Sequence, residues 1–232
     1  MTERVALVTG SARGIGRAVA EALAATGCAV IGVDVLPQEP GRLARTVVAD
    51  LADPETCRRV AHDAGPVDIL VNNAALLIQA PIRDFTLDDF ERTIAINLRA
   101  PFLLCQSLVE GMAQRGWGRI VNVSSVGART GGVSQSAIYN ATKAALISLT
   151  KNLARNYGPF GVTANAVAPG AVDTQMIAHF SADERARIVT QVPLGRFSQP
   201  EEIAAVIAFL ASQQASYVTG ATVDVNGGWV MT

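Results

Sequence analysis

The sequence has few cysteines, few aromatic residues and no excess of charge of either sign. Of its 232 residues, 3 are cysteine, 5% are aromatic and 17% are charged. The cysteines lie far apart and form no C-x-x-C pair, which argues against a disulfide framework and against a zinc site. With 19 Lys and Arg against 20 Asp and Glu, the net charge is −1. The sequence therefore lacks the basic footprint of a nucleic-acid-binding protein.

Long hydrophobic runs are also missing. No apolar stretch is long enough to span a bilayer, and the first residues show no apolar segment followed by a cleavage site. Half of the residues are nevertheless hydrophobic, which supplies a large core and is the opposite of the balance that disorder requires. We expect a cytoplasmic protein without a membrane partner, and the length predicts one domain.

Short apolar runs alternate with helical segments along the whole chain. Continuous apolar runs are typical of parallel strands that are covered on both faces. The pattern predicts an α/β fold with one domain over residues 1–232, a doubly wound parallel sheet of seven strands (a Rossmann fold). The expected strands are 5–9, 28–34, 46–50, 67–71, 119–124, 162–167 and 222–225. The expected helices are 17–26, one opening at 54, 87–115 with a bend near Pro101, 138–157 and 200–212.

A glycine-rich turn between the first strand and the first helix is typical of a dinucleotide site. Glycines at 10, 14 and 16 permit a tight turn and let backbone N–H groups approach a pyrophosphate at the helix N-terminus. Asp34 ends the second strand at the distance expected for an acidic residue that binds the adenosine ribose hydroxyls.

A second group of residues suits proton transfer. Tyr139 and Lys143 are four residues apart and so share one helical face, where an ammonium would favour the phenolate. Ser124 and Ser125 end the fifth strand. Either hydroxyl is a candidate to bind a carbonyl or alcohol oxygen near Tyr139, and backbone capping is the alternative role for both.

Together these residues resemble the short-chain dehydrogenase/reductase family over essentially the whole chain. The resemblance includes TGSARGIG at 9–16, Asp50 after the third strand, NNA at 72–74, Asn97, the SS…YNATK arrangement, and PGAVDT at 169–174. It implies hydride transfer between a nicotinamide cofactor and an alcohol or carbonyl carbon, and a substrate lid at about 175–200. Met176, Ile177 and Phe180 make that lid apolar, which favours a substrate with a hydrophobic part.

The resemblance also implies individual roles. Tyr139 would be the general acid/base, and Lys143 would lower the pKa of Tyr139 and bind the nicotinamide ribose. Ser125, preferred over Ser124, would polarise the substrate oxygen, and Asn97 would anchor a water that links Lys143 to solvent. The implied cofactor-binding residues are Gly10, Arg13, Gly14, Ile15, Gly16, Asp34, Asp50, Leu51, Asn73, Ala74, Tyr139, Lys143, Pro169, Gly170, Val172 and Thr174, without a metal.

Three departures from the family pattern stand out. Ala75 replaces the last glycine of the usual NNAG. The gap between Ser125 and Tyr139 is one residue longer than usual, which we place in the loop at 127–135. The segment between Asp34 and Asp50 is short and broken by proline, so the helix usual there is expected to be cut down or missing.

The sequence is compatible with three functions. The leading hypothesis is an NAD-dependent oxidoreductase for a secondary alcohol or ketone, since Asp34 favours NAD over NADP. An NADPH-dependent 3-oxoacyl-thioester reductase is the second, because Arg13 is a cation that would meet a 2′-phosphate. A non-catalytic cofactor-binding scaffold is the third, and the intact Tyr139, Lys143 and Asn97 argue against it.

Two segments predict self-association. Segments 98–112 and 140–156 carry Leu and Ala around most of a helical circumference, which indicates burial on more than the sheet side. Members of the family commonly pair these helices across a two-fold axis. We expect the protein to form a homo-oligomer, and specifically a homotetramer.

Overall fold

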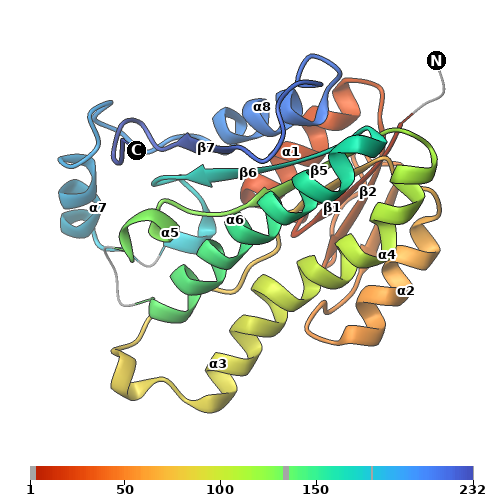
Figure 1. Ribbon diagram of the computed structural model, residues 1–232. Helices are drawn as coiled ribbons and strands as arrows, with labels where there is room; N and C mark the ends of the chain where they lie inside the picture. Colours follow the sequence, from red (N-terminus) through yellow and green to blue (C-terminus); the bar gives the residue numbers. More distant parts are fainter. Residues whose placement is uncertain (1–3, 133–135, 179, 232) are drawn as a thin grey trace.

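Seven parallel strands form one sheet in the order β3-β2-β1-β4-β5-β6-β7 (Figure 1). The computed structural model describes residues 4–132, 136–178 and 180–231. The strands are β1 Val5–Thr9, β2 Ala29–Asp34, β3 Arg45–Val48, β4 Ile69–Asn72, β5 Gly118–Val123, β6 Val162–Pro169 and β7 Thr222–Val225. The predicted seven-stranded doubly wound sheet is confirmed. The order reverses between β1 and β4, so the carboxyl ends of these strands face a crevice of the kind that binds ligands in such sheets.

Helices cover both faces of the sheet. Helices α1 (Gly14–Ala25) and α8 (Pro200–Ala211) pack on one face, and α2 (Pro54–Ala64), α4 (Ala100–Gln114) and α6 (Ala137–Tyr157) pack on the other (Figure 1). The remaining α-helices of the described residues are α3 (Leu87–Ile94), α5 (Gly127–Thr130) and α7 (Ala182–Val189).

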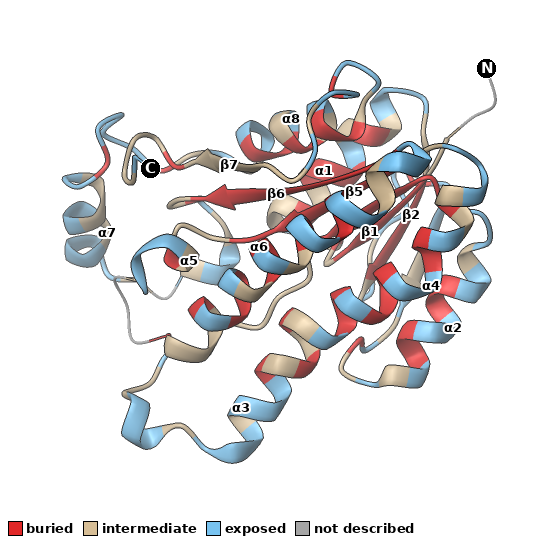
Figure 2. Ribbon diagram, viewed as in Figure 1, coloured by how far each residue is buried: buried red, intermediate tan, exposed pale blue. Residues whose placement is uncertain are grey.

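The core has two halves because strand side chains alternate between faces. In β1, Leu7 belongs to the cluster under α2, α4 and α6, while its neighbours Ala6 and Val8 belong to the cluster under α1 and α8. The inner strands are buried along their length, whereas the edge strands β3 and β7 are not (Figure 2). This explains why the inner strands read as continuous apolar runs in the sequence.

The single helix predicted over 87–115 is interrupted, and the interruption begins six residues before Pro101, where a bend was expected. A π-helical turn over Ala95–Arg99 separates α3 from α4. Pro101 has no N–H and sits in the first turn of α4, so it cannot donate the helical hydrogen bond to the carbonyl of Asn97. Such turns often mark functional positions in helices.

The connection between β2 and β3 contains no helix, as expected from its short length. Residues 35–44 instead form turns that fold back over the glycine-rich turn. The hydroxyl of Ser11 donates to Gln38 Oε1 at 3.0 Å, and Arg17 Nη1 donates to the carbonyl of Glu39 at 2.7 Å. The glycine turn is therefore supported by this connection.

Most of the apolar residues of α4 and α6 are buried within the chain itself. Leu104, Leu108 and Met112 of α4 are 0–6% exposed, and Leu146 and Leu153 of α6 are 1% and 6% exposed. The apolar positions left accessible on these helices include Phe102, which is 47% exposed, with Ala141 and Ala144. The sheet and the neighbouring helices take up most of these side chains, and burial of the remaining exposed positions against a second copy stays a prediction.

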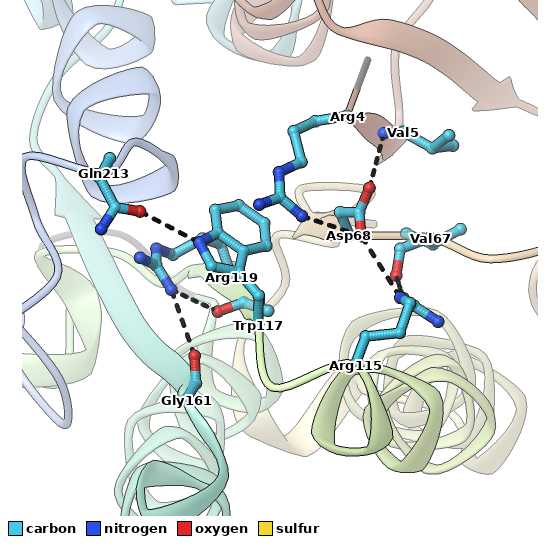
Figure 3. A network of polar contacts seen from close by, with 10 residues as sticks. Arg4, Val5, Val67, Asp68, Arg115, Trp117, Arg119, Gly161 and Gln213 are labelled. Atoms are coloured by element: carbon cyan, nitrogen blue, oxygen red, sulfur yellow. Dashed lines mark hydrogen bonds and ion pairs between the residues drawn. The ribbon is translucent and has the colours of Figure 1, made fainter. Parts of the chain in front are cut away.

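A polar network ties the amino ends of the central strands together (Figure 3). Asp68 accepts a hydrogen bond from the Val5 N–H at 3.1 Å and pairs with Arg4 and Arg115 at 3.6 and 3.5 Å. The guanidinium carbons of Arg4 and Arg119 lie 3.8 and 4.4 Å from the centroid of the Trp117 ring. This network stands at the opposite end of the strands from the crevice.

Candidate active site

Two adjoining cavities open at the carboxyl ends of the strands. The first has a volume of about 440 Å³ and the second about 550 Å³, and Leu77 and Met176 line both. The predicted cofactor residues on the wall of the first cavity are Gly10, Arg13, Gly14, Ile15, Gly16, Asp34, Asp50, Leu51, Asn73, Ala74 and Thr174. Ser125, Tyr139, Gly170 and Val172 line the second. Pro169 is buried at the end of β6, next to Gly170.

The glycine positions of the glycine-rich turn have no room for a side chain. Gly10 has φ +68°, and a Cβ there would lie 2.8 Å from Asn73 Nδ2 and 2.9 Å from Ala74 Cα. A Cβ on Gly16 would lie 2.0 Å from the carbonyl oxygen of Gly10. Asn73 holds the turn by donating from Nδ2 to the carbonyls of Thr9 and Gly10 at 2.9 and 3.1 Å. The turn leads into the N-terminus of α1, so its residues fit the diphosphate of a dinucleotide.

The carboxylate of Asp34 is fixed at the wall of the first cavity. Oδ2 accepts from the Ala12 N–H and Oδ1 accepts from the Leu36 N–H, both at 2.9 Å. Each carboxylate oxygen has a second lone pair, so further donors such as ribose hydroxyls can still bind. Asp34 thus lies on the wall of the first cavity, and its binding of the adenosine ribose stays a prediction.

The structure distinguishes the two serines at the end of β5. Ser124 is buried and its hydroxyl donates to the backbone carbonyl of Lys143 at 2.8 Å. Ser125 lines the second cavity, accepts from the Gly127 N–H at 3.0 Å and hydrogen-bonds the Tyr139 phenol. Ser125 and not Ser124 therefore accompanies Tyr139 in the cavity.

Lys143 lies next to Tyr139 and is only 2% exposed. Its Nζ donates to the carbonyl of Val123 at 2.7 Å and lies 5.5 Å from the centroid of the Tyr139 ring. Burial lowers the pKa of the Lys143 ammonium to about 7, since no carboxylate among its contacts stabilises the charge.

Tyr139 has the opposite shift from the one expected. Burial raises the pKa of its phenol to about 12, and the hydrogen bond with Ser125 only opposes this rise. Burial is the largest cause of this shift, and the role expected of Lys143, to lower the pKa of the Tyr139 phenol, stays a prediction. Helical spacing predicted that the two side chains would be neighbours, but it did not show that Lys143 is buried while Tyr139 is half-buried on the cavity wall.

The low pKa of Lys143 predicts a pH-dependent stability. An unfolded lysine has a pKa of about 10.4, so between about pH 7 and 10 the unfolded chain binds one more proton at this site than the folded chain. The free energy of unfolding therefore gains a positive slope with pH across this range. We expect Lys143→Met to flatten that slope, as measured by urea unfolding at several pH values. Equal slopes in both proteins would show that Lys143 is not buried in its neutral form.

Asn97 connects the π-helical turn to the loop that follows β4. Its Oδ1 accepts from the Leu76 N–H at 2.8 Å, and its Nδ2 donates to the Leu76 carbonyl at 2.9 Å and lies 3.3 Å from the Thr142 hydroxyl. Asn97 is fully buried, so its side chain positions the loop between the two cavities and does not itself line either of them.

The three departures have physical accounts. Every non-glycine residue described has a negative φ, so Ala75 adopts its position on the cofactor cavity wall without backbone strain. The lengthened Ser125–Tyr139 gap contains α5, while residues 133–135 of that loop lie outside the described part. The missing β2–β3 helix is replaced by the turns over residues 35–44.

Sequence reasoning missed several residues that line the cavities. Arg92 at the end of α3 and Ile96 in the π turn line the first cavity. They are four residues apart and Ile96 directly precedes Asn97, so helical spacing could have placed both near the site. Gln191 and Trp229 line the second cavity. Nothing local marks Trp229, because its position depends on how the chain returns after β7.

No helix of the described residues is long and apolar enough to cross a bilayer. Within the same residues, no group of three or more His, Cys, Asp or Glu side chains is placed to hold a metal ion.

Known proteins share this architecture along its whole length. A family model described as enoyl-(acyl carrier protein) reductase matches residues 10–230. The 3-oxoacyl-[acyl-carrier-protein] reductase FabG of Aquifex aeolicus is 41% identical, over 97% of this chain and 96% of that protein. Nodulation protein G of Azospirillum brasilense is 38% identical, over 98% of each chain.

Solved structures agree with these relatives. A 3-oxoacyl (acyl-carrier-protein) reductase from Agrobacterium tumefaciens with NADP bound has a TM-score of 0.91 and 36% identity, over 97% of this chain and 93% of that one. A protein from Beutenbergia cavernae, provisionally assigned as an NAD(P)-dependent gluconate 5-dehydrogenase with NADP at low occupancy, has a TM-score of 0.94 and 36% identity, over 97% and 96%.

The fold and the paired cavities define a nicotinamide-dinucleotide oxidoreductase built on a Rossmann sheet. Within that class, the chain belongs to the short-chain dehydrogenase/reductase family.

Proposed function

We propose that the protein reduces the ketone of a 3-oxoacyl thioester. The observation that carries this proposal is the Tyr139 phenol, hydrogen-bonded to Ser125 on the wall of a cavity that adjoins the dinucleotide cavity. With its pKa raised to about 12, the phenol is in the acid form at neutral pH. This is the form that gives a proton to a carbonyl oxygen during reduction. The 3-oxoacyl reductases among the relatives support the same substrate class.

In this mechanism Ser125 and Tyr139 both donate hydrogen bonds to the substrate carbonyl oxygen, and Tyr139 transfers its proton to that oxygen. When bound, the reduced nicotinamide supplies the hydride to the carbonyl carbon. Gly10, Gly14 and Gly16 would hold the diphosphate, Asp34 the adenosine ribose, Asp50 and Leu51 the adenine border, and Thr174 the carboxamide side.

Lys143 and Asn97 would renew the proton on Tyr139. The buried ammonium, with a pKa of about 7, exchanges protons readily at neutral pH. Because Pro101 cannot donate to the Asn97 carbonyl, we propose that this oxygen accepts from a water linking Lys143 to solvent.

A kinetic comparison tests the proposed reaction. Purified protein is assayed with acetoacetyl and longer 3-oxoacyl thioesters in the presence of NADH or NADPH, and with secondary alcohols in the presence of NAD or NADP. We expect kcat/KM for the thioester reduction to exceed that for any simple alcohol by at least about tenfold, which is about 1.4 kcal/mol of transition-state stabilisation. Turnover of alcohols with none of thioesters would overturn the proposal.

The hypothesis favoured from the sequence, an NAD-dependent secondary alcohol dehydrogenase, is now the second candidate. The relatives agree better with the thioester reductase. The fixed carboxylate of Asp34 nevertheless supports the NAD part of that hypothesis, and we propose NAD(H) as the preferred cofactor of the reductase.

We further infer a single domain over residues 1–232, a lid over about 175–200 that contains α7, a cytoplasmic location and a homotetramer. Phe102, Ala141 and Ala144 form the exposed surface through which α4 and α6 would meet a second copy. Sedimentation velocity is expected to show a tetramer, and replacing the exposed Phe102 with Glu is expected to reduce the assembly. A stable monomer at assay concentrations would contradict this.

A further inference from the structure

Beyond Ser125 and Tyr139, the wall of the second cavity combines apolar and aromatic side chains with polar ones that include Glu184 and Arg187. The apolar part includes Phe180, Ile188, Phe197 and Trp229. Of these, Trp229 is the only one that does not belong to the lid region or its flank, because it lies on the segment that follows β7. The last residues of the chain thus contribute an aromatic ring to the pocket that would hold the substrate.

The backbone of this segment is held in place. Asn226 is 7% exposed, its Nδ2 donates to the Val230 carbonyl at 2.9 Å, and its Oδ1 accepts from the Gly228 N–H at 3.0 Å. The Trp229 N–H donates to the Asn226 carbonyl at 3.1 Å. Asn226 therefore closes a turn on both sides of Trp229.

The turn also packs against the chain that follows α7. Gly227 has φ +65°, and a Cβ on it would lie 2.7 Å from Val192 Cγ1. The carbonyl of Gly227 accepts from the Leu194 N–H at 3.2 Å. A glycine is required at this position, and the contact fixes the segment relative to the lid.

The indole ring is fixed separately from its backbone. Its Nε1 donates to Gln191 Oε1 at 3.3 Å, and Gln191 Nε2 donates to the Arg187 carbonyl at 3.2 Å. The polar atom of the indole is thereby satisfied, which leaves the carbon surface of the ring as the part that meets an apolar ligand.

We propose that Trp229, oriented by Gln191, forms the end wall of the substrate cavity and limits the length of the apolar arm that the enzyme accepts. This inference rests on the proposed function, since the arm is the acyl chain of the 3-oxoacyl thioester. An arm that reaches the ring gains contact with every added methylene, and an arm that is longer than the cavity clashes with the ring unless the hydrogen bond to Gln191 breaks.

The chain offers a direct probe of this contact. It contains 2 tryptophans, and Trp117 lies in the network at the amino ends of the strands, away from both cavities. Trp117→Phe therefore leaves Trp229 as a single fluorescent reporter in the substrate cavity. The background variant itself is expected to keep the wild-type chain-length profile.

The first measurement follows Trp229 emission during titration with a series of thioesters from acetoacetyl to 3-oxododecanoyl. We expect a saturable blue shift and an affinity that rises by up to about fourfold per methylene, up to a limiting length. The second measurement compares kcat/KM along the series. Trp229→Ala is expected to raise the ratio of long-chain to short-chain kcat/KM by about tenfold, and Trp229→Phe, which keeps an aromatic wall, by much less.

The outcomes separate this inference from the proposed function. Turnover of thioesters with a length profile that Trp229→Ala leaves unchanged would overturn the inference and leave the reductase standing. A length-dependent emission change without turnover would overturn the reductase and leave the inference standing. If Trp229→Ala does not fold, the reporter titration and Trp229→Phe still decide, because an emission that ignores chain length overturns the end wall.

Discussion

Tyr139→Phe is expected to lower kcat for carbonyl reduction by roughly a hundred- to ten-thousandfold. The substitution removes one hydroxyl from a position where the phenol hydrogen-bonds Ser125 and faces the cavity. The phenylalanine ring occupies the same space as the tyrosine ring, and the substitution changes no residue of the glycine turn. The dissociation constant for the dinucleotide, measured by fluorescence titration, should therefore change by less than about threefold.

The chain supplies a matched control for this experiment. Tyr157 stands on the same helix, and its phenol hydrogen-bonds Glu110 at 2.7 Å on the protein surface, outside both cavities. Tyr157→Phe makes the same chemical change and should leave kcat within about twofold of the unmodified protein. A Tyr139→Phe variant with more than a tenth of normal kcat would remove Tyr139 from the role of proton donor.

Most of the fold could be predicted from the sequence because each strand is a short apolar run closed by a turn. The ends moved by one or two residues, as in β3, which stops at Val48 where the predicted strand continued to Asp50. The π-helical turn at Ala95–Arg99 could not be predicted, since apolar periodicity reports which face of a helix is buried and not which carbonyl a given N–H reaches.

The site was predictable to the extent that its residues lie at strand ends or at helical spacing. The sequence alone could not firmly distinguish the roles of Ser124 and Ser125. The two serines differ in where the hydroxyl points: that of Ser125 lies at the cavity, and that of Ser124 donates to the Lys143 carbonyl. The pKa of Tyr139 depends on burial, which spacing does not report. Trp229 depends on the path of the chain after β7 and left no local signal.

Cofactor choice is the second large effect, and it depends on Asp34. Its carboxylate is held by the N–H groups of Ala12 and Leu36 and cannot swing away without losing both hydrogen bonds. The 2′-phosphate of NADP carries roughly −1.5 to −2 charges if it behaves like other phosphomonoesters. A unit charge pair at about 4 Å costs roughly 4 kcal/mol at an effective dielectric constant of about 20, before screening by salt.

We expect the nearby cations to offset only part of this repulsion. Arg13 of the glycine turn and Arg92 of α3 both line the same cavity. The position after Asp34 is Val35, 59% exposed on the cavity wall, where a second cation would have to stand. NADP is bound in the solved relatives, so a preference of this chain for NADH would have to come from Asp34 and its neighbours.

We therefore expect kcat/KM with NADH to exceed that with NADPH by at least about tenfold, equivalent to about 1.4 kcal/mol. Asp34→Asn keeps the size of the side chain and removes its charge, so it should narrow the difference without reversing it. Asp34→Ala combined with Val35→Arg removes the repulsion and adds a donor for the phosphate, and it should reverse the preference. Because the repulsion is electrostatic and partly exposed, the preference of the unmodified protein should shrink as salt is added. Equal use of both cofactors by the unmodified protein at low salt would mean that Arg13 outweighs Asp34, and NADPH would then replace NADH as the proposed reductant.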